Sequence, residues 1–106
     1  MDTTRLGRSD IEVGRISYGC WRLAGHDVTS AAAVAEAHQK IETALDCGMT
    51  LIDTADIYGV DTAGFGAAED LLGRVLAAHP SLRERMVVAT KGGIVPPVPY
   101  DSSADH

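Results

Sequence analysis

Three observations in the sequence predict an α/β fold built on a parallel sheet. Short aliphatic segments with almost no polar alternation recur along the chain. Stretches with helical periodicity separate these segments, and this order is typical of parallel strands buried on both faces. Glycine or polar residues immediately follow each segment. In parallel sheets these positions form the carboxyl-terminal edge, where active and ligand-binding sites are found.

The first element is expected to be a β-hairpin over residues 3–14. Its two short extended pieces flank a turn at Gly7–Asp10, whose Gly, Ser and Asp residues favour tight turns. A short strand is then expected at Arg15–Gly19, before a polar, glycine-containing loop at Ala24–Thr29.

The spacing of apolar residues predicts a first helix over Ala31–Cys47. Thr29 or Ser30 can cap its start, and Gly48 stands where a left-handed residue often ends a helix. Residues at three- and four-residue steps form one stripe that we expect to be buried: Val34, Ala37, Ile41, Ala44 and Leu45.

A second strand is expected at Met49–Ile52, and the glycine-bearing loop Gly59–Gly66 precedes a second helix over Ala67–Ala78. Glu69 in the first turn of that helix suits the helix dipole, and Pro80 ends it. The helix is expected to bury the following side chains: Ala68, Leu71, Leu72, Val75 and Leu76.

A third strand is expected at Met86–Thr90, after a solvated, charged connector at Arg83–Arg85. The strand is rich in β-branched residues and ends at Lys91–Gly93. Residues 94–106 begin as an extended loop with three prolines, and Asp101–Ser103 has the pattern that starts a helix.

Length, composition and charge restrict the possible function classes. The 106 residues are 45% hydrophobic, which is enough apolar material for a core and excludes a disordered acidic tail. A net charge of −6 without a basic stripe disfavours nucleic acid as a partner. We also expect no membrane span and no signal peptide. The two cysteines, Cys20 and Cys47, fit a reducing compartment, so a cytoplasmic protein is expected.

Polar side chains at the strand ends suggest proton-transfer chemistry. A carboxylate (Asp53), a phenol (Tyr58) and an ammonium group (Lys91) follow neighbouring strands, and such groups can protonate a carbonyl oxygen together. A tyrosine hydroxyl, with a pKa of about 10, is a weak acid at neutral pH, and a nearby ammonium group lowers that pKa. Spacing alone also allows a plain alternative, in which Asp53 caps a turn and Lys91 is solvated.

Four segments resemble the aldo-keto reductase family. Leu51–Gly59 resembles the family signature, in which a strand delivers an Asp and the following loop a Tyr and a Gly. Gly66–Gly73 resembles the next element, a glycine, a Glu and an apolar–Gly pair on a helix. Val87–Gly93 resembles the third strand with its Lys, and Leu6–Val13 resembles the hairpin that closes the bottom of these barrels.

A fifth segment, Gly19–Gly25, suggests the bacterial oxidoreductase branch of the family, and its layout is also similar to the potassium-channel β-subunit branch. Together the five elements cover about residues 5–93 in family order, which is far more specific than a lone motif. The resemblance implies the N-terminal portion of a (β/α)8 TIM barrel. Residues 1–106 would form a truncated domain with its hairpin at 3–14, strands and helices at 15–93, and a loop and helix start at 94–106.

The resemblance implies an enzyme that reduces aldehydes or ketones to alcohols by hydride transfer from NADPH. Tyr58 would be the general acid, Lys91 the partner that lowers its pKa, and Asp53 the carboxylate beside both, near the cofactor. Cys20 and Trp21 match the segment that touches the nicotinamide and its ribose. Trp21 would also wall the substrate pocket, or else pack on the barrel rim.

The resemblance also implies that part of the site lies elsewhere. A TIM barrel needs about 250 residues, and the family's catalytic His after strand four and most of its NADPH-phosphate contacts would follow residue 106. We therefore expect a fragment that is inactive alone, from an enzyme acting on a small carbonyl substrate. Asp56 would either cap its loop or serve the site. The four histidines lack metal-ligand spacing, so no metal site is expected.

Two alternatives remain open at this point. The first is a non-catalytic remnant or regulatory module of the same fold. The second is an unrelated barrel or doubly wound enzyme that uses Asp53 as a metal ligand.

Overall fold

The computed structural model describes residues 1–105, which form two small sheets and two α-helices. The first sheet is antiparallel and pairs β1 (Thr3–Arg5) with β2 (Glu12–Gly14). The second sheet is parallel, in the order β3 (Tyr18–Gly19), β4 (Leu51–Asp53) and β5 (Val87–Ala89). The predicted parallel α/β order is therefore confirmed over the described residues.

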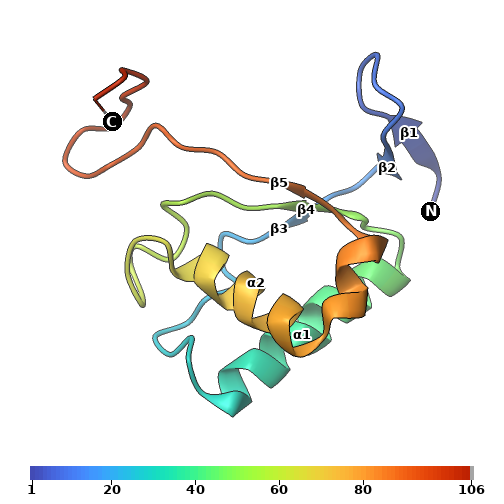
Figure 1. Cartoon of the computed structure of the whole chain (residues 1–106), viewed down its shortest axis with the longest axis horizontal. Coiled ribbons are helices and arrows are strands. Elements are labelled where there is room, and N and C mark those ends of the chain that lie inside the picture. The colour runs from blue at the N-terminus through green and yellow to red at the C-terminus, as the bar shows by residue number, and fades with distance from the viewer. Residues whose placement is uncertain (106) are drawn as a thin grey trace.

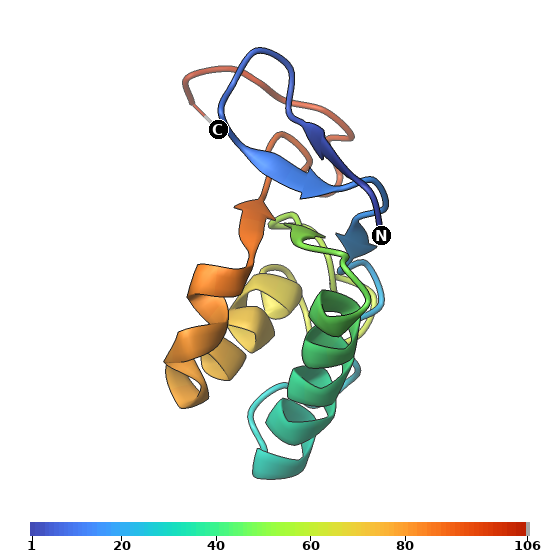
Figure 2. The same ribbon diagram turned by 90° about the vertical axis from the view of Figure 1, so that its right-hand side faces the viewer.

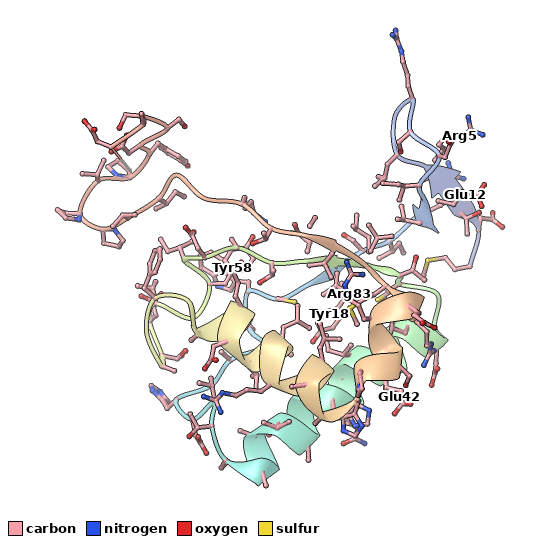
Figure 3. All side chains as sticks on the ribbon, viewed as in Figure 1. Arg5, Glu12, Tyr18, Glu42, Tyr58 and Arg83 are labelled. Atoms are coloured by element: carbon pink, nitrogen blue, oxygen red, sulfur yellow. The ribbon has the colours of Figure 1, made fainter. Side chains whose placement is uncertain are left out.

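The N-terminal hairpin has the predicted position and turn. Arg5 pairs with Glu12 across the two strands, and Figure 3 labels both residues on the hairpin at the edge of the molecule. Ser9 Oγ donates a hydrogen bond of 2.6 Å to Leu6 O, which closes the turn. Gly7 has a φ of +56°, a conformation that glycine adopts without strain.

The two α-helices are α1 (Ala31–Asp46) and α2 (Ala67–Ala78), close to their predicted bounds. Of the two possible caps of α1, Ser30 is the one used, since its Oγ accepts a hydrogen bond of 3.1 Å from Ala33 N–H. Gly48 has a φ of +91° after the helix, as expected for a left-handed residue at this position.

The core lies between the helices and one face of the parallel sheet. Figures 1 and 2 show both helices on the same side of β3, β4 and β5. Val34 and Leu76, predicted to be buried, are only partly so. The side chains that fill the core include Ala37, Ile41, Leu45, Ile52, Ala68, Leu71, Leu72 and Val75. Each large aliphatic residue among them contributes about 1.5–3 kcal/mol through its burial.

The prediction that the sheet is buried on both faces is wrong for this structure. Within residues 1–105, the opposite side carries no helix, only the hairpin and residues 94–105 (Figure 2). All three residues of β5 are half-buried, and the structure measures 39 × 38 × 19 Å. The reason is geometric, because three parallel strands cannot close on themselves, so in the described part of the chain β3 and β5 each have a strand partner on one side only.

The connector before β5 is more ordered than predicted. Residues Pro80–Arg85 form a 3₁₀ helix, η1, in which Leu82 is buried. Arg83 Nη1 donates a hydrogen bond of 3.0 Å to Met86 O, and Arg85 forms an ion pair of 2.7 Å with Asp46 of α1. Two arginines of the connector therefore bind the carbonyl of the following residue and the end of α1 instead of being only solvated.

The C-terminal segment is extended and contains one isolated bridge, between Val95 and Val98. Asp101 Oδ1 accepts a hydrogen bond of 2.9 Å from Ser103 N–H, a contact of the kind that starts helices. Residues 94–105 contain no helix, and His106 lies outside the described residues, so the predicted helix start stays a prediction. No helix within residues 1–105 is long and apolar enough to cross a membrane.

Candidate active site

The parallel register places the predicted site residues at one edge of the sheet. Gly19 pairs with Asp53, and Asp53 pairs with Ala89, so the three strands end side by side. Two backbone hydrogen bonds of 2.8 Å extend the ladder past these ends, from Cys20 N–H to Asp53 O and from Thr54 N–H to Ala89 O. The residues that follow the strands therefore have fixed relative positions.

Asp53, Tyr58 and Lys91, which the sequence predicts as a catalytic set, lie together at this edge. Lys91 Nζ donates hydrogen bonds of 2.9 Å to Asp53 Oδ1 and 2.8 Å to Thr54 O. The same ammonium group lies 4.7 Å from the centroid of the Tyr58 ring. The arrangement brings an acid, a cation and a carboxylate within reach of one small molecule.

The surroundings of Lys91 keep it charged. Burial by itself would lower the pKa of its ammonium group, but Tyr58 and Asp53 raise it through hydrogen bonding and charge, and the net shift is upward. Lys91 is therefore an ammonium group at neutral pH. It is available to Tyr58 as a fixed positive charge.

Tyr58 is held in the loop that follows β4. Figure 3 shows its side chain beyond the carboxyl end of this strand. Tyr58 O accepts a hydrogen bond of 3.0 Å from Ala68 N–H at the start of α2. The next residue, Gly59, has a φ of +98°, and a Cβ atom there would lie 2.7 Å from Ala67 Cβ, so the close approach of loop and helix requires glycine.

Trp21 lies directly beside Tyr58. Their ring centroids are 5.0 Å apart at 66°, an edge-to-face contact, and 55% of Trp21 remains exposed. A cavity of about 270 Å³ lies at this contact, and both rings and Lys91 line it. Its lining residues are Trp21, Ala55, Asp56, Ile57, Tyr58, Lys91, Gly92, Ile94 and Tyr100.

Cys20, predicted to contact a cofactor, lies in the core behind the site. It is 0% exposed, so its thiol has no surface with which to touch a cofactor. Burial, and after it the negative charge of Asp53, raises the pKa of the thiol to about 11. The thiol is therefore protonated at neutral pH, and a cofactor contact by its side chain has no support in this geometry.

Two contacts near the site have no clear signal in the sequence. Thr54 offers its backbone carbonyl to Lys91, and any residue could supply that group. Thr90 Oγ1 donates a hydrogen bond of 2.7 Å to Glu69 Oε2 on α2, although 21 residues separate the two positions. The sequence indicates only that Glu69 stands in the first turn of a helix, not which strand end it reaches.

Asp56 follows β4 and lies at the cavity. Its backbone N–H donates to Lys91 O at 3.2 Å, and its carboxylate lines the cavity, near Gly92. Within residues 1–105, no three His, Cys, Asp or Glu side chains are grouped so that they could hold a metal ion. Asp53 contacts Lys91 instead.

Three comparisons with known proteins agree on one family. The family model described as "Aldo/keto reductase family" matches residues 15–106. A 6-dehydroglucose reductase from Novosphingobium aromaticivorans is 58% identical over 103 residues, which are 96% of this chain and 33% of that protein. A 6-dehydroglucose reductase from Agrobacterium fabrum is 45% identical over 94% of this chain and 31% of its own length.

The structure gives the same result. It superposes on an aldo-keto reductase from Bacillus halodurans, in its holo form, with a TM-score of 0.64 and 30% identity, over 88% of this chain and 26% of the other. The chain spans about a third of the length of the curated relatives that it matches. The chain belongs to the aldo/keto reductase family.

Proposed function

We propose that this chain forms the N-terminal third of an enzyme that reduces aldehydes or ketones to alcohols with NADPH. The observation that carries the proposal is the cluster of Tyr58, Lys91 and Asp53 at the carboxyl edge of the sheet. A phenol next to a fixed ammonium group is a suitable proton donor to a carbonyl oxygen. The family membership and the printed names of the relatives support an oxidoreductase.

In the proposed reaction Tyr58 donates its hydroxyl proton to the carbonyl oxygen of the substrate. The bond between the proton and the Tyr58 oxygen breaks, and the electron pair stays on that oxygen as a phenolate. The Lys91 ammonium, 4.7 Å from the ring, stabilises this developing negative charge. Asp53 and the carbonyl of Thr54 hold Lys91 in place for this role.

The described residues fit the reactive end of a nicotinamide cofactor. The exposed indole of Trp21 and the largely apolar cavity beside it suit a flat ring, next to Tyr58 and Lys91. When bound, NADPH would supply the hydride that reaches the carbonyl carbon. The lining of the cavity includes a single cation, Lys91, which is already paired with Asp53, so other residues of the enzyme would bind the phosphates.

The substrate that we propose is a sugar with an aldehyde or ketone group. Two relatives, at 58% and 45% identity, are named 6-dehydroglucose reductases. Tyr58 and the Asp56 carboxylate both line the cavity, so a carbonyl oxygen at Tyr58 would leave Asp56 available to sugar hydroxyl groups.

We also propose that residues 1–106 are inactive alone. Over the described residues the parallel sheet has three strands and carries helices on one face only, so no helix covers its other face. The thiols of Cys20 and Cys47 are free, in keeping with the reducing, cytoplasmic location that we propose.

The test is to express the complete protein that carries this chain and, separately, residues 1–106. Purified protein is assayed for oxidation of NADPH that depends on an added carbonyl compound, with 6-dehydroglucose and glyceraldehyde as probes. We expect activity only from the complete protein. If the complete, folded protein reduces neither probe with NADPH or NADH, the proposed function is wrong and a non-catalytic role replaces it.

A further inference from the structure

The first turn of α2 contacts Tyr58 and the residue that precedes Lys91. Ala68 N–H donates a hydrogen bond of 3.0 Å to the carbonyl of Tyr58. The adjacent residue, Glu69, accepts a hydrogen bond of 2.7 Å from the hydroxyl of Thr90, which directly precedes Lys91. One helical turn therefore binds the loop that bears Tyr58 and the strand end that bears Lys91. Figure 1 shows the start of α2 beside the loop that follows β4.

The bond to Thr90 has a direct consequence for Lys91. In extended chain, neighbouring side chains point to opposite faces, so fixing Thr90 toward α2 directs Lys91 to the opposite face. On that face Lys91 Nζ reaches Asp53 Oδ1 and Thr54 O. The Lys91 carbonyl in turn accepts a hydrogen bond of 3.2 Å from Asp56 N–H, so the backbone is held on that side as well.

On the side of α2, the strand end is held through the hydrogen bond from Thr90 to Glu69. β5 ends at Ala89, and in the described residues its only strand neighbour is β4. The side chain of Lys91 is 49% exposed, so packing alone does not immobilise it. The N-cap of α2 is Gly66, which has no capping side chain, and Glu69 is one of the two acidic residues in the first turn, where a negative charge suits the helix dipole.

We infer that Glu69 is a positioning residue, which acts through Thr90 to hold Lys91 at the distance from Tyr58 that proton donation requires. This inference rests on the proposed function. Glu69 is not among the residues that line the cavity at Tyr58 and Trp21. Its effect is on the geometry of Lys91, so its loss lowers the rate of the chemical step more than it weakens substrate binding.

The experiment uses the complete protein with two matched pairs of variants. Glu69→Leu and Thr90→Val each remove the hydrogen bond, whereas Glu69→Gln and Thr90→Ser keep an acceptor and a donor. Asp70→Ala is the control, because Asp70 is the next carboxylate of the same turn and pairs with Arg74 at 3.1 Å, away from β5. Steady-state kcat and KM for the carbonyl substrate and the unfolding temperature are measured for each variant.

We expect Glu69→Leu and Thr90→Val to lower kcat about 10- to 100-fold with little change in KM, as for a catalytic group displaced by about 1 Å. The conservative variants should recover most of kcat, and the double variant Glu69→Leu/Thr90→Val should be no slower than either single variant, because both remove one bond. If Glu69→Leu keeps the kcat of Asp70→Ala, the inference is wrong. A fall that Glu69→Gln does not recover also overturns it. A parent protein without any reductase activity instead contradicts the proposed function.

Discussion

Lys91 and Asp53 are 38 residues apart in the sequence, yet the Lys91 ammonium donates a hydrogen bond of 2.9 Å to Asp53 Oδ1. The pair joins the ends of β4 and β5 at the edge of the sheet where Tyr58 lies. Because the carboxylate forms an ion pair with the ammonium group and orients it, the two residues act as one unit. Removal of either side chain should therefore change the ability of Tyr58 to donate its proton.

Tyr58→Phe should lower kcat for carbonyl reduction in the complete protein about 10²- to 10⁴-fold, the usual contribution of a general acid. The phenyl ring keeps the contacts with Trp21 and Lys91, so the fold should be retained. Carbonyl-dependent oxidation of NADPH and circular dichroism check the two points. Tyr18→Phe is the matched control, because Tyr18 lies in β3 among α1 residues such as Lys40 and Thr43, away from Lys91. A Tyr58→Phe enzyme as fast as this control would contradict the proposed mechanism.

Lys91→Met should be about as damaging to kcat as Tyr58→Phe, since it leaves the developing phenolate without its cation in a partly desolvated site. Methionine retains much of the length of the side chain but not its charge. Lys40→Met provides the comparison, because Lys40 forms only an exposed ion pair of 3.1 Å with Glu36 on α1. Equal kcat values for the two lysine variants would show that the ammonium group at position 91 has no part in the reaction.

Asp53→Asn should shift the pH dependence of kcat. Hydrogen bonding and charge from Asp53 help to raise the pKa of Lys91, so the neutral amide allows that pKa to fall. The ammonium form is then lost at lower pH, and the alkaline limb of the kcat profile should move to lower pH. Asp46→Asn should leave the limb in place, since Asp46 pairs with Arg85 at the end of α1. A limb that stays fixed or moves to higher pH in Asp53→Asn would refute this coupling.

Gly59→Ala should destabilise the protein more than Gly64→Ala. Both glycines have a positive φ, +98° and +124°, and each alanine has a backbone cost of about 1–2 kcal/mol there. At Gly59 the new Cβ would also lie 2.7 Å from Ala67 Cβ, whereas at Gly64 it meets nothing within 4 Å. Overpacking of this kind adds about 1–3 kcal/mol. Chemical denaturation of the complete protein gives both free energies of unfolding, and equal losses would mean that the loop relaxes away from α2.

Local elements were predictable because their signals lie within a few residues. The helix over Ala67–Ala78 has the predicted bounds, since its apolar stripe and the flanking Gly66 and Pro80 lie within one stretch of chain. The hairpin and the cap at Ser30 follow from equally local chemistry. η1 was missed because the buried side chain of Leu82 stabilises it against the rest of the core, and a charged sequence such as Arg83–Arg85 gives no sign of that contact.

The sequence by itself determined the order of strands and helices and the residue types at the strand ends, including Asp53, Tyr58 and Lys91, because periodicity and turn chemistry act over short range. Only the tertiary structure decided which further groups surround them. It gave Lys91 a second partner in the carbonyl of Thr54, placed the thiol of Cys20 in the core and bound Glu69 to Thr90. The physical reason is the parallel register of β3, β4 and β5, which aligns strand ends that are distant in the chain and which no local pattern encodes.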